Sequence, residues 1–296
     1  MKKEKIKFEK TISNNMKSQL LRSSPIFIIP TLIAFIIGFL WPFLWGIYLS
    51  FFKFKTLKFM EFTGFKNYVL AFNDSSFLYS FFFTAIFAIV VVIIINLSAF
   101  FLAYILTNKL KGTNIFRTIF FMPNLIGGIV LAYVWKEIMN DFIQKTYNSA
   151  LMLNANYGFW GLVILLSWQQ IGYMMIIYIA GLQNVSKELV EAAKIDGANS
   201  FQILRKITIP SVMPSVTICL FLSLTNAFKL FDQNLALTSG SPNRKTEMLA
   251  LNIYNAFYSN ATNVGIGQAK AVIFFILVVS ISLSQLYLTR KREVEI

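Results

Sequence analysis

Six apolar blocks constrain the fold of this chain more than any other feature. They cover residues 25–52, 79–107, 118–137, 157–181, 212–236 and 266–289. An α-helix needs roughly 20 apolar residues to cross the hydrocarbon layer of a membrane, and each block is at least that long. Because backbone N–H and C=O groups in lipid need partners within the protein, each block is expected to be helical. The blocks predict an all-α integral membrane protein with six transmembrane helices.

The composition agrees with a membrane protein. Hydrophobic residues make up 56% of the 296 residues, and the mean hydropathy is +0.63. Soluble domains are usually about 45–50% apolar. A net charge of +14 in a soluble protein would suggest nucleic acid, but here the charges flank the apolar blocks. We therefore expect membrane lipid around the chain and no nucleic-acid partner.

Lysine and arginine are distributed unevenly between the segments that connect the blocks. The N-terminal tail 1–24, the segments 108–117 and 182–211 and the C-terminal tail 290–296 together hold 17, whereas the alternate segments hold 8. Cytoplasmic segments of membrane proteins carry the excess of positive charge. This bias predicts one multi-pass transmembrane domain over 25–289 with both termini in the cytoplasm.

Residue types that carry catalysis or bind metals are scarce. The sequence has no His, which is the usual general base and the commonest metal ligand. Its single Cys, Cys219, lies inside an apolar block. It also lacks the glycine-rich Gly-x-x-x-x-Gly-Lys-Ser/Thr stretch that cradles nucleotide phosphates. We expect no catalytic residue, no metal site and no cofactor in this chain.

The 182–211 segment contains signals for two short helices. Ser186 is a good N-cap for a helix over 187–195. Gly197 permits a sharp reversal, because only glycine adopts positive φ at little cost. A second helix is expected from about residue 199 to 208, and the prolines at 210 and 214 are expected to begin the next transmembrane helix.

These two helices would form a compact knob, defined here as residues 186–210. The small side chains of Ala192, Ala193 and Ala198 would let a partner's backbone approach one side of the knob closely. The knob would also offer apolar contacts through the side chains of Leu189, Val190, Ile195 and Phe201. One interpretation is a surface on which a partner protein docks. The other is a loop that folds back onto its own bundle.

The knob also carries a family resemblance. Glu191-Ala192-Ala193 followed by Asp196-Gly197-Ala198 and Pro210 resembles the EAA loop of ABC-importer permeases. The fuller form Glu-Ala-Ala-Lys-Ile-Asp-Gly-Ala is similar to the carbohydrate-uptake branch, with its maltose, multiple-sugar and glycerol-3-phosphate permeases. Apolar Leu204 departs from the Phe that is frequent in the family.

Other stretches extend the resemblance over about residues 25–290. They are Gly64–Tyr68, Phe116–Pro123 with Trp135, Ser167–Gln183, and Thr238–Pro242, where serines replace glycines of the family pattern. The resemblance implies a type I ABC-importer permease fold in a bacterial cell membrane. It also implies that the EAA loop couples the chain to an ATPase.

The resemblance further implies partners. A second permease subunit would complete a heterodimer, two ATPase subunits would bind ATP and Mg²⁺, and an extracellular solute-binding protein would deliver a sugar-like solute. Glu191 and Asp196 would meet basic groups of the ATPase, and Gly197 would let the loop enter a cleft on it. ATP hydrolysis would reside in the partner, so this chain would not be an enzyme.

Polar residues inside apolar blocks are candidates for the solute path. In a continuous helix over the fifth block, Asn226, Lys229 and Gln233 would share one face, and Asp232 would lie close enough to Lys229 to pair with it. Gln169 and Tyr173 form a second candidate face, and Asn124 beside the expected Pro123 kink is a third. The alternative is that these groups satisfy one another at a subunit interface.

Two other functions remain open from the residues. The chain could be an ABC permease for a non-sugar solute, such as a polyamine or a phosphorylated compound. It could also be a secondary transporter, which would work without an ATPase and would need no docking knob.

Overall fold

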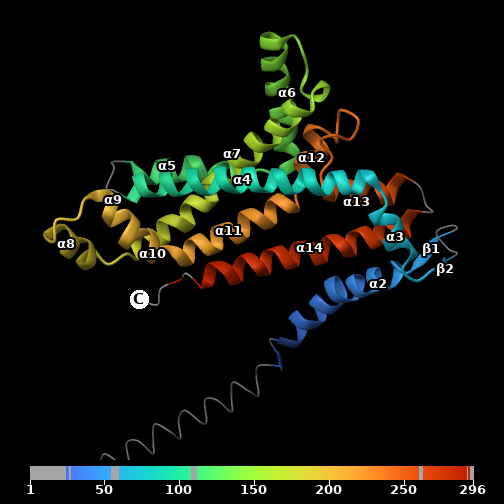
Figure 1. The fold of residues 1–296 in the computed structure, drawn as a ribbon, viewed down its shortest axis with the longest axis horizontal. Coiled ribbons are helices and arrows are strands. Elements are labelled where there is room, and N and C mark those ends of the chain that lie inside the picture. The colour runs from blue at the N-terminus through green and yellow to red at the C-terminus, as the bar shows by residue number, and fades with distance from the viewer. Residues whose placement is uncertain are drawn as a thin grey trace, which may run out of the picture.

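Long helices dominate the computed structural model, which describes residues 25–26, 28–54, 60–107, 112–259, 263–291 and 293 (Figure 1). Within these ranges, four unbroken helices are long and apolar enough to span a membrane; they are Ile28–Leu49, α4 (Ser75–Thr107), α7 (Ala155–Gln183) and α14 (Val264–Arg290). The first includes a π-helical turn, η1 (Ile36–Leu40), followed by α2 (Trp41–Leu49). The tail 1–24, most of 290–296 and residues 108–111 lie outside the described residues.

Two bent helix pairs supply the remaining spans. One pair joins α5 (Thr113–Phe121) and η2 (Met122–Leu125) to α6 (Gly128–Tyr147) with a bend of 101°. The other joins α9–η4–α10 to α11 (Met213–Phe228) with a bend of 69°. If each pair is one span, the described residues contain six, and the predicted six-helix membrane fold is confirmed.

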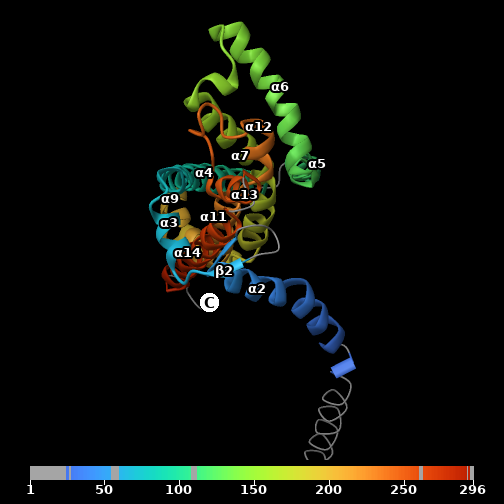
Figure 2. The same cartoon turned by 90° about the vertical axis from the view of Figure 1, so that its right-hand side faces the viewer.

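The first bend agrees with the kink expected at Pro123, but it divides the helix predicted over 118–137 into separate helices. Pro123 lies in the 3₁₀ turn η2, and the backbone then becomes extended at Ile126 (φ −86°, ψ 132°). Gly127 is extended as well, so the helical bonds are interrupted before α6 begins. α6 then runs ten residues past the predicted end, to Tyr147; it packs against α12 and projects from the rest of the bundle (Figure 2).

The second bend lies just before the fifth apolar block. The second knob helix consists of α9 (Ser200–Ile203), the π-helical η4 (Leu204–Thr208) and α10 (Ile209–Ser211). Pro214 has no N–H with which to bond the carbonyl of residue 210, so the helix breaks at Val212 (φ −93°, ψ 0°). Pro210 therefore lies in the last turn of the knob helix, and the prediction that it begins the transmembrane helix is wrong.

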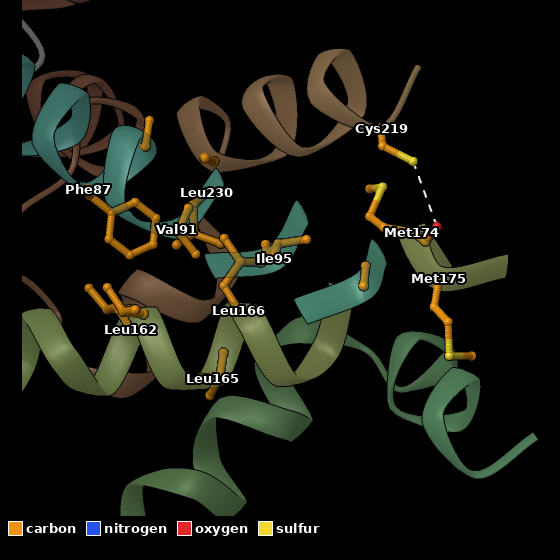
Figure 3. Packing of buried hydrophobic residues seen from close by; sticks show 14 of the residues in the cluster. Phe87, Val91, Ile95, Leu162, Leu165, Leu166, Met174, Met175, Cys219 and Leu230 are labelled. Carbon is orange, nitrogen blue, oxygen red and sulfur yellow. Dashed lines mark hydrogen bonds between the residues drawn. The ribbon is translucent and has the colours of Figure 1, made fainter. Parts of the chain in front are cut away.

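The core forms where α4, α7 and α11 pack together (Figure 3). Phe87, Val91 and Ile95 of α4 lie against Leu162 and Leu166 of α7. Cys219 of α11 is fully buried, and its Sγ lies 3.7 Å from the carbonyl oxygen of Met174. The single thiol is thus a small core side chain, as its apolar context predicts.

A polar triad lies within this core and joins the same three helices. Asn96 of α4 donates from Nδ2 to Ser223 Oγ of α11 at 2.8 Å, and it accepts from the hydroxyl of Tyr178 of α7 at 2.8 Å. Buried polar groups are costly without partners. Because these three satisfy one another, they fix the relative positions of the helices rather than mark a solute site.

Short elements gather at the end of the bundle opposite the knob helix α8 (Lys187–Ile195) (Figure 1). They are an antiparallel pair of strands, β1 (Phe52–Phe54) and β2 (Met60–Phe62), in which Phe52 lies opposite Phe62, together with the helices α3 (Lys66–Phe72) and α13 (Leu249–Ser259). The turn η3 (Leu151–Leu153) precedes α7, and α12 (Asp232–Leu237) follows α11.

A buried charged network connects α13 to its neighbours. The ammonium of Lys270 in α14 donates to Asp74 Oδ2 at 2.6 Å and to Asn252 Oδ1 of α13 at 2.9 Å. Asn252 in turn donates to Glu247 at 3.0 Å, and Arg244 binds both oxygens of the Glu247 carboxylate at 2.9 Å. The network fixes α13 against α4 and α14, and the sequence assigned no role to it.

Candidate functional site

The first knob helix forms where the sequence predicts it. α8 covers Lys187–Ile195, and Ser186 caps it by accepting a hydrogen bond from the backbone N–H of Leu189 at 3.3 Å. Glu188 in the first turn and Lys194 in the last suit the helix dipole. α8 contains no buried residue. The exposed helix favours a docking surface over a loop packed on its own bundle.

Gly197 forms the corner between the two knob helices. Its φ of +81° is left-handed, and the N–H of Ala198 closes the end of α8 by donating to the carbonyl of Ala193 at 2.9 Å. A Cβ added to Gly197 would meet nothing within 4 Å. The position therefore requires glycine for its backbone conformation and not for lack of space within this chain.

The second knob helix begins with a reciprocal cap. The side chain of Asn199 accepts from the N–H of Gln202 at 2.9 Å, and the side chain of Gln202 accepts from the N–H of Asn199 at 2.8 Å. These two bonds fix the start of α9 directly after the glycine corner. The knob is thus a defined structure whose apolar side chains Ile195 and Phe201 remain 86% and 67% exposed.

A cleft of about 370 Å³ opens between the two knob helices. Its lining is Ala193, Asp196, Gly197, Ala198, Gln202, Ile203, Lys206 and Ile207. Four of the seven coupling residues named from the sequence therefore lie together in it. Glu191 and Ala192 are exposed on α8 outside the lining, and Pro210 lies farther along in α10. Gln202 and Lys206 line the cleft but were not predicted.

A second, polar pocket of about 250 Å³ lies where α11 ends. It is lined by Leu166 and Gln170 of α7, and by Asn226, Lys229, Leu230, Phe231, Asp232 and Gln233. The four residues of the fifth apolar block that were predicted for the solute path therefore lie together in this pocket. They do not, however, share one face of a single helix. α11 stops at Phe228, and Phe231 (φ −117°, ψ −60°) precedes the new helix α12, so the predicted continuous helix is wrong.

Side-chain amides connect this pocket across helices. Gln233 Nε2 donates to Gln169 Oε1 at 2.8 Å, and Gln169 Nε2 donates to the carbonyl of Ile126 at 3.1 Å. Asn226 Nδ2 donates to Gln170 Oε1 at 3.2 Å. Gln170 was not predicted, because the spacing of Gln169 and Tyr173 indicated a different face of α7.

The other sequence candidates lie elsewhere. Tyr173 packs against Phe121, with ring centroids 6.5 Å apart, and Asn124 is partly buried in η2; neither lines the pocket. Within the described part of the chain, no ion pair joins Lys229 to Asp232. The expected pairing fails because the chain leaves the helix between them. Both charged side chains are exposed in this chain.

Comparison with known proteins places this geometry in a family. Residues 111–294 match the family model described as binding-protein-dependent transport system inner membrane component. The chain is 46% identical over 277 residues to the probable starch degradation products transport system permease protein AmyD of Thermoanaerobacterium thermosulfurigenes, covering 91% of this chain and 94% of the relative. It is 31% identical to the multiple sugar-binding transport system permease protein MsmF of Streptococcus mutans, covering 90% and 95%.

A solved structure shares the fold. A bacterial ABC transporter involved in the import of the acidic polysaccharide alginate matches with a TM-score of 0.78 at 18% identity, over 94% of this chain and 99% of the matched one. At this identity the likeness concerns the fold alone. The family match covers the knob, the polar pocket and the last four apolar blocks. The chain belongs to the family of inner membrane components of binding-protein-dependent transport systems.

Proposed function

We propose that this chain is one permease subunit of an ATP-driven importer that takes up a sugar or oligosaccharide delivered by a solute-binding protein. The knob is the observation that carries the proposal. It is a capped, glycine-cornered structure that exposes its apolar residues and keeps a cleft open at one end of the bundle. A secondary transporter would have no use for such a surface.

The knob would couple the chain to an ATPase subunit. Exposed Glu191 and Asp196 offer negative charge at this end of the chain, and opposite charge on a partner steers and orients docking. ATP and Mg²⁺ would bind to two such ATPase subunits, and this chain would catalyse no reaction itself. A second permease subunit would complete a heterodimer and supply the other half of the path.

The polar pocket would form part of the solute path. Its amides present both donors and acceptors, which suits the hydroxyl groups of a sugar. Two relatives are named for starch degradation products and for multiple sugars, which also supports a carbohydrate. The excess of Lys and Arg on one set of segments supports a bacterial cell-membrane protein with both termini in the cytoplasm.

Substitutions in the knob test the coupling role. Gly197→Val forces a β-branched side chain into a left-handed backbone, at a cost of about 1–2 kcal/mol or more, and fills space that a partner would need. Gly64→Val is the matched control, because Gly64 has φ +58°, open space around its Cβ and a place at the opposite end of the bundle. Glu191→Lys reverses a surface charge of the knob.

We expect both knob variants to insert normally but to lose co-purification with the ATPase, or to uncouple ATP hydrolysis from uptake. The Gly64→Val control carries the same backbone strain and should retain ATPase docking. Wild-type docking and uptake in both knob variants would refute the coupling role. A panel of labelled sugars tested against the solute-binding protein that works with this chain would then identify the solute class.

A further inference from the structure

Three aromatic rings continue from the polar pocket to the exposed face of α13. Phe231 lines the pocket, and its ring centroid lies 5.1 Å from that of Tyr254. The ring of Tyr254 lies 4.5 Å from that of Tyr258, one helical turn farther along. We call Phe231, Tyr254 and Tyr258 the aromatic ladder.

Exposure of the aromatic ladder increases with distance from the pocket. Phe231 is partly buried, Tyr254 is 38% exposed and Tyr258 is 74% exposed. α13 lies at the end of the bundle opposite α8 (Figure 1). The ladder thus leads from the amide pocket toward the end of the molecule that faces away from the knob.

The helix that carries the two tyrosines is held rigidly from its other face. Asn252 donates to Ser76 Oγ at 2.9 Å and to Glu247 at 3.0 Å, and it accepts from the buried ammonium of Lys270. The side chain of Asn255 also donates to Glu247. Because these bonds fix α13, the two rings are preorganised, and a ligand that contacts them loses little free energy in ordering them.

The chemistry of the ladder fits a chain of sugar rings. A pyranose has apolar C–H faces that pack on aromatic rings, and hydroxyl groups at its edge that need hydrogen bonds. The pocket offers amides for hydroxyl groups, and the ladder offers successive aromatic surfaces. An aromatic surface also accepts different glycosyl units, because packing on a ring face needs no fixed hydrogen-bond pattern.

We propose that the aromatic ladder is a binding subsite for the additional glycosyl units of an oligosaccharide whose leading unit enters the amide pocket. This assignment rests on the proposed sugar-import function and specifies it: the solute is an oligosaccharide, and the ladder favours longer chains over shorter ones. A disaccharide has too few rings to occupy both the pocket and the full ladder.

Competitive uptake into vesicles tests the ladder. The assembled importer, with its second permease, ATPase and solute-binding protein, is reconstituted and given maltose and maltohexaose carrying different radiolabels. Tyr254→Ala and Tyr258→Ala remove ring surface, whereas Tyr258→Phe keeps the ring and removes only the hydroxyl. Tyr287→Ala is the matched control, because Tyr287 is a 62% exposed tyrosine near the C-terminal end of α14, away from the ladder.

We expect each alanine variant to lower the uptake of maltohexaose relative to maltose by about three- to tenfold, since one aromatic contact contributes that much to affinity. Tyr258→Phe and Tyr287→Ala should keep the wild-type ratio. An unchanged ratio in both alanine variants would overturn the ladder while leaving the import function intact. Equal loss of both sugars, with loss of ATPase stimulation by the solute-binding protein, would make the rings a protein-docking surface and would also overturn it.

Failure of the wider proposal has a different signature. If the wild-type assembly takes up neither sugar but its solute-binding protein stimulates ATP hydrolysis with a non-sugar ligand, the sugar-import function fails, and the ladder assignment fails with it. The wild-type arm therefore reports on the function, and the ratio between sugars in the variants reports on the ladder.

Discussion

Lys270 offers the sharpest test of how this fold is held together. Its side chain is only 4% exposed, and its ammonium bonds Asp74 and Asn252. The ammonium also lies 5.2 Å from the centroid of the Phe77 ring. Lys270→Met keeps most of the side-chain volume and removes the charge. The substitution therefore isolates the electrostatic part of the contact between α14, α13 and the start of α4.

The expected loss of stability follows from the groups that Lys270→Met leaves without their partner. Removing one partner of a buried ion pair costs about 3–5 kcal/mol, but the side chain of Asp74 is 35% exposed, so water replaces part of the lost interaction. The carbonyl oxygen of the Asn252 amide loses its partner, at about 1–3 kcal/mol. A net destabilisation of about 2–4 kcal/mol is expected, which corresponds to a fall in Tm of roughly 5–15 °C.

The assay is the thermal stability of the detergent-solubilised chain, followed as loss of its monodisperse chromatographic peak. Lys291→Met is the control, since Lys291 is exposed just after the end of α14. Asp74→Asn combined with Lys270→Met should recover part of the loss. The amide retains an acceptor oxygen for the backbone N–H groups of Ser76 and Phe77 but leaves no unpaired charge. A Tm of Lys270→Met equal to that of the control would refute this account of the network.

The same pair predicts a dependence on pH. Burial raises the pKa of Asp74, but the hydrogen bond and charge of Lys270, with the N–H groups of Ser76 and Phe77, outweigh it and hold the pKa below its usual 3.8. In the wild type, the stability that the lowered pKa of Asp74 contributes is fully present above the pKa that Asp74 has in the unfolded chain. It is lost only as the pH falls through the lower pKa of the folded chain. Without Lys270, Asp74 loses the two largest interactions that lower its pKa, so the pKa rises. The stability deficit of Lys270→Met should therefore shrink as the pH falls toward 4, which a Tm series across pH would measure.

Two further predictions concern the solute path and the topology. Asn226→Ala, Lys229→Ala and Gln233→Ala should each lower uptake while the ATPase still co-purifies, because these residues line the pocket and not the knob; normal uptake in all three would remove the pocket from the path. Cysteines at the exposed positions Ser75 and Asn148 should react with a reagent that does not cross the membrane, since both lie on the side with fewer positive charges. Reaction only after permeabilisation would reverse the orientation.

Much of the helical framework could be predicted because its causes are local. Runs of apolar residues force helices in lipid, whatever their neighbours are, and so the four unbroken spans lie within a few residues of their blocks. The first knob helix matched its predicted bounds, 187–195, because Ser186 and Gly197 fix its two ends through their own backbone chemistry. The cleft residues that were predicted lie within a few positions of that corner.

What the sequence alone did not determine depends on contacts between distant residues. The fifth block was expected to be one helix, yet α11 stops at Phe228, and the fold brings Gln170 of α7 into the polar pocket at this break. Lys270 lies within the sixth apolar block, and only the fold places Asp74, 196 positions earlier, within 2.6 Å of its ammonium. The aromatic ladder likewise joins two segments that no helical period connects. Local sequence determines where a helix can form, because its hydrogen bonds are local. Only the tertiary structure decides which polar and aromatic side chains meet, because their partners lie on other helices.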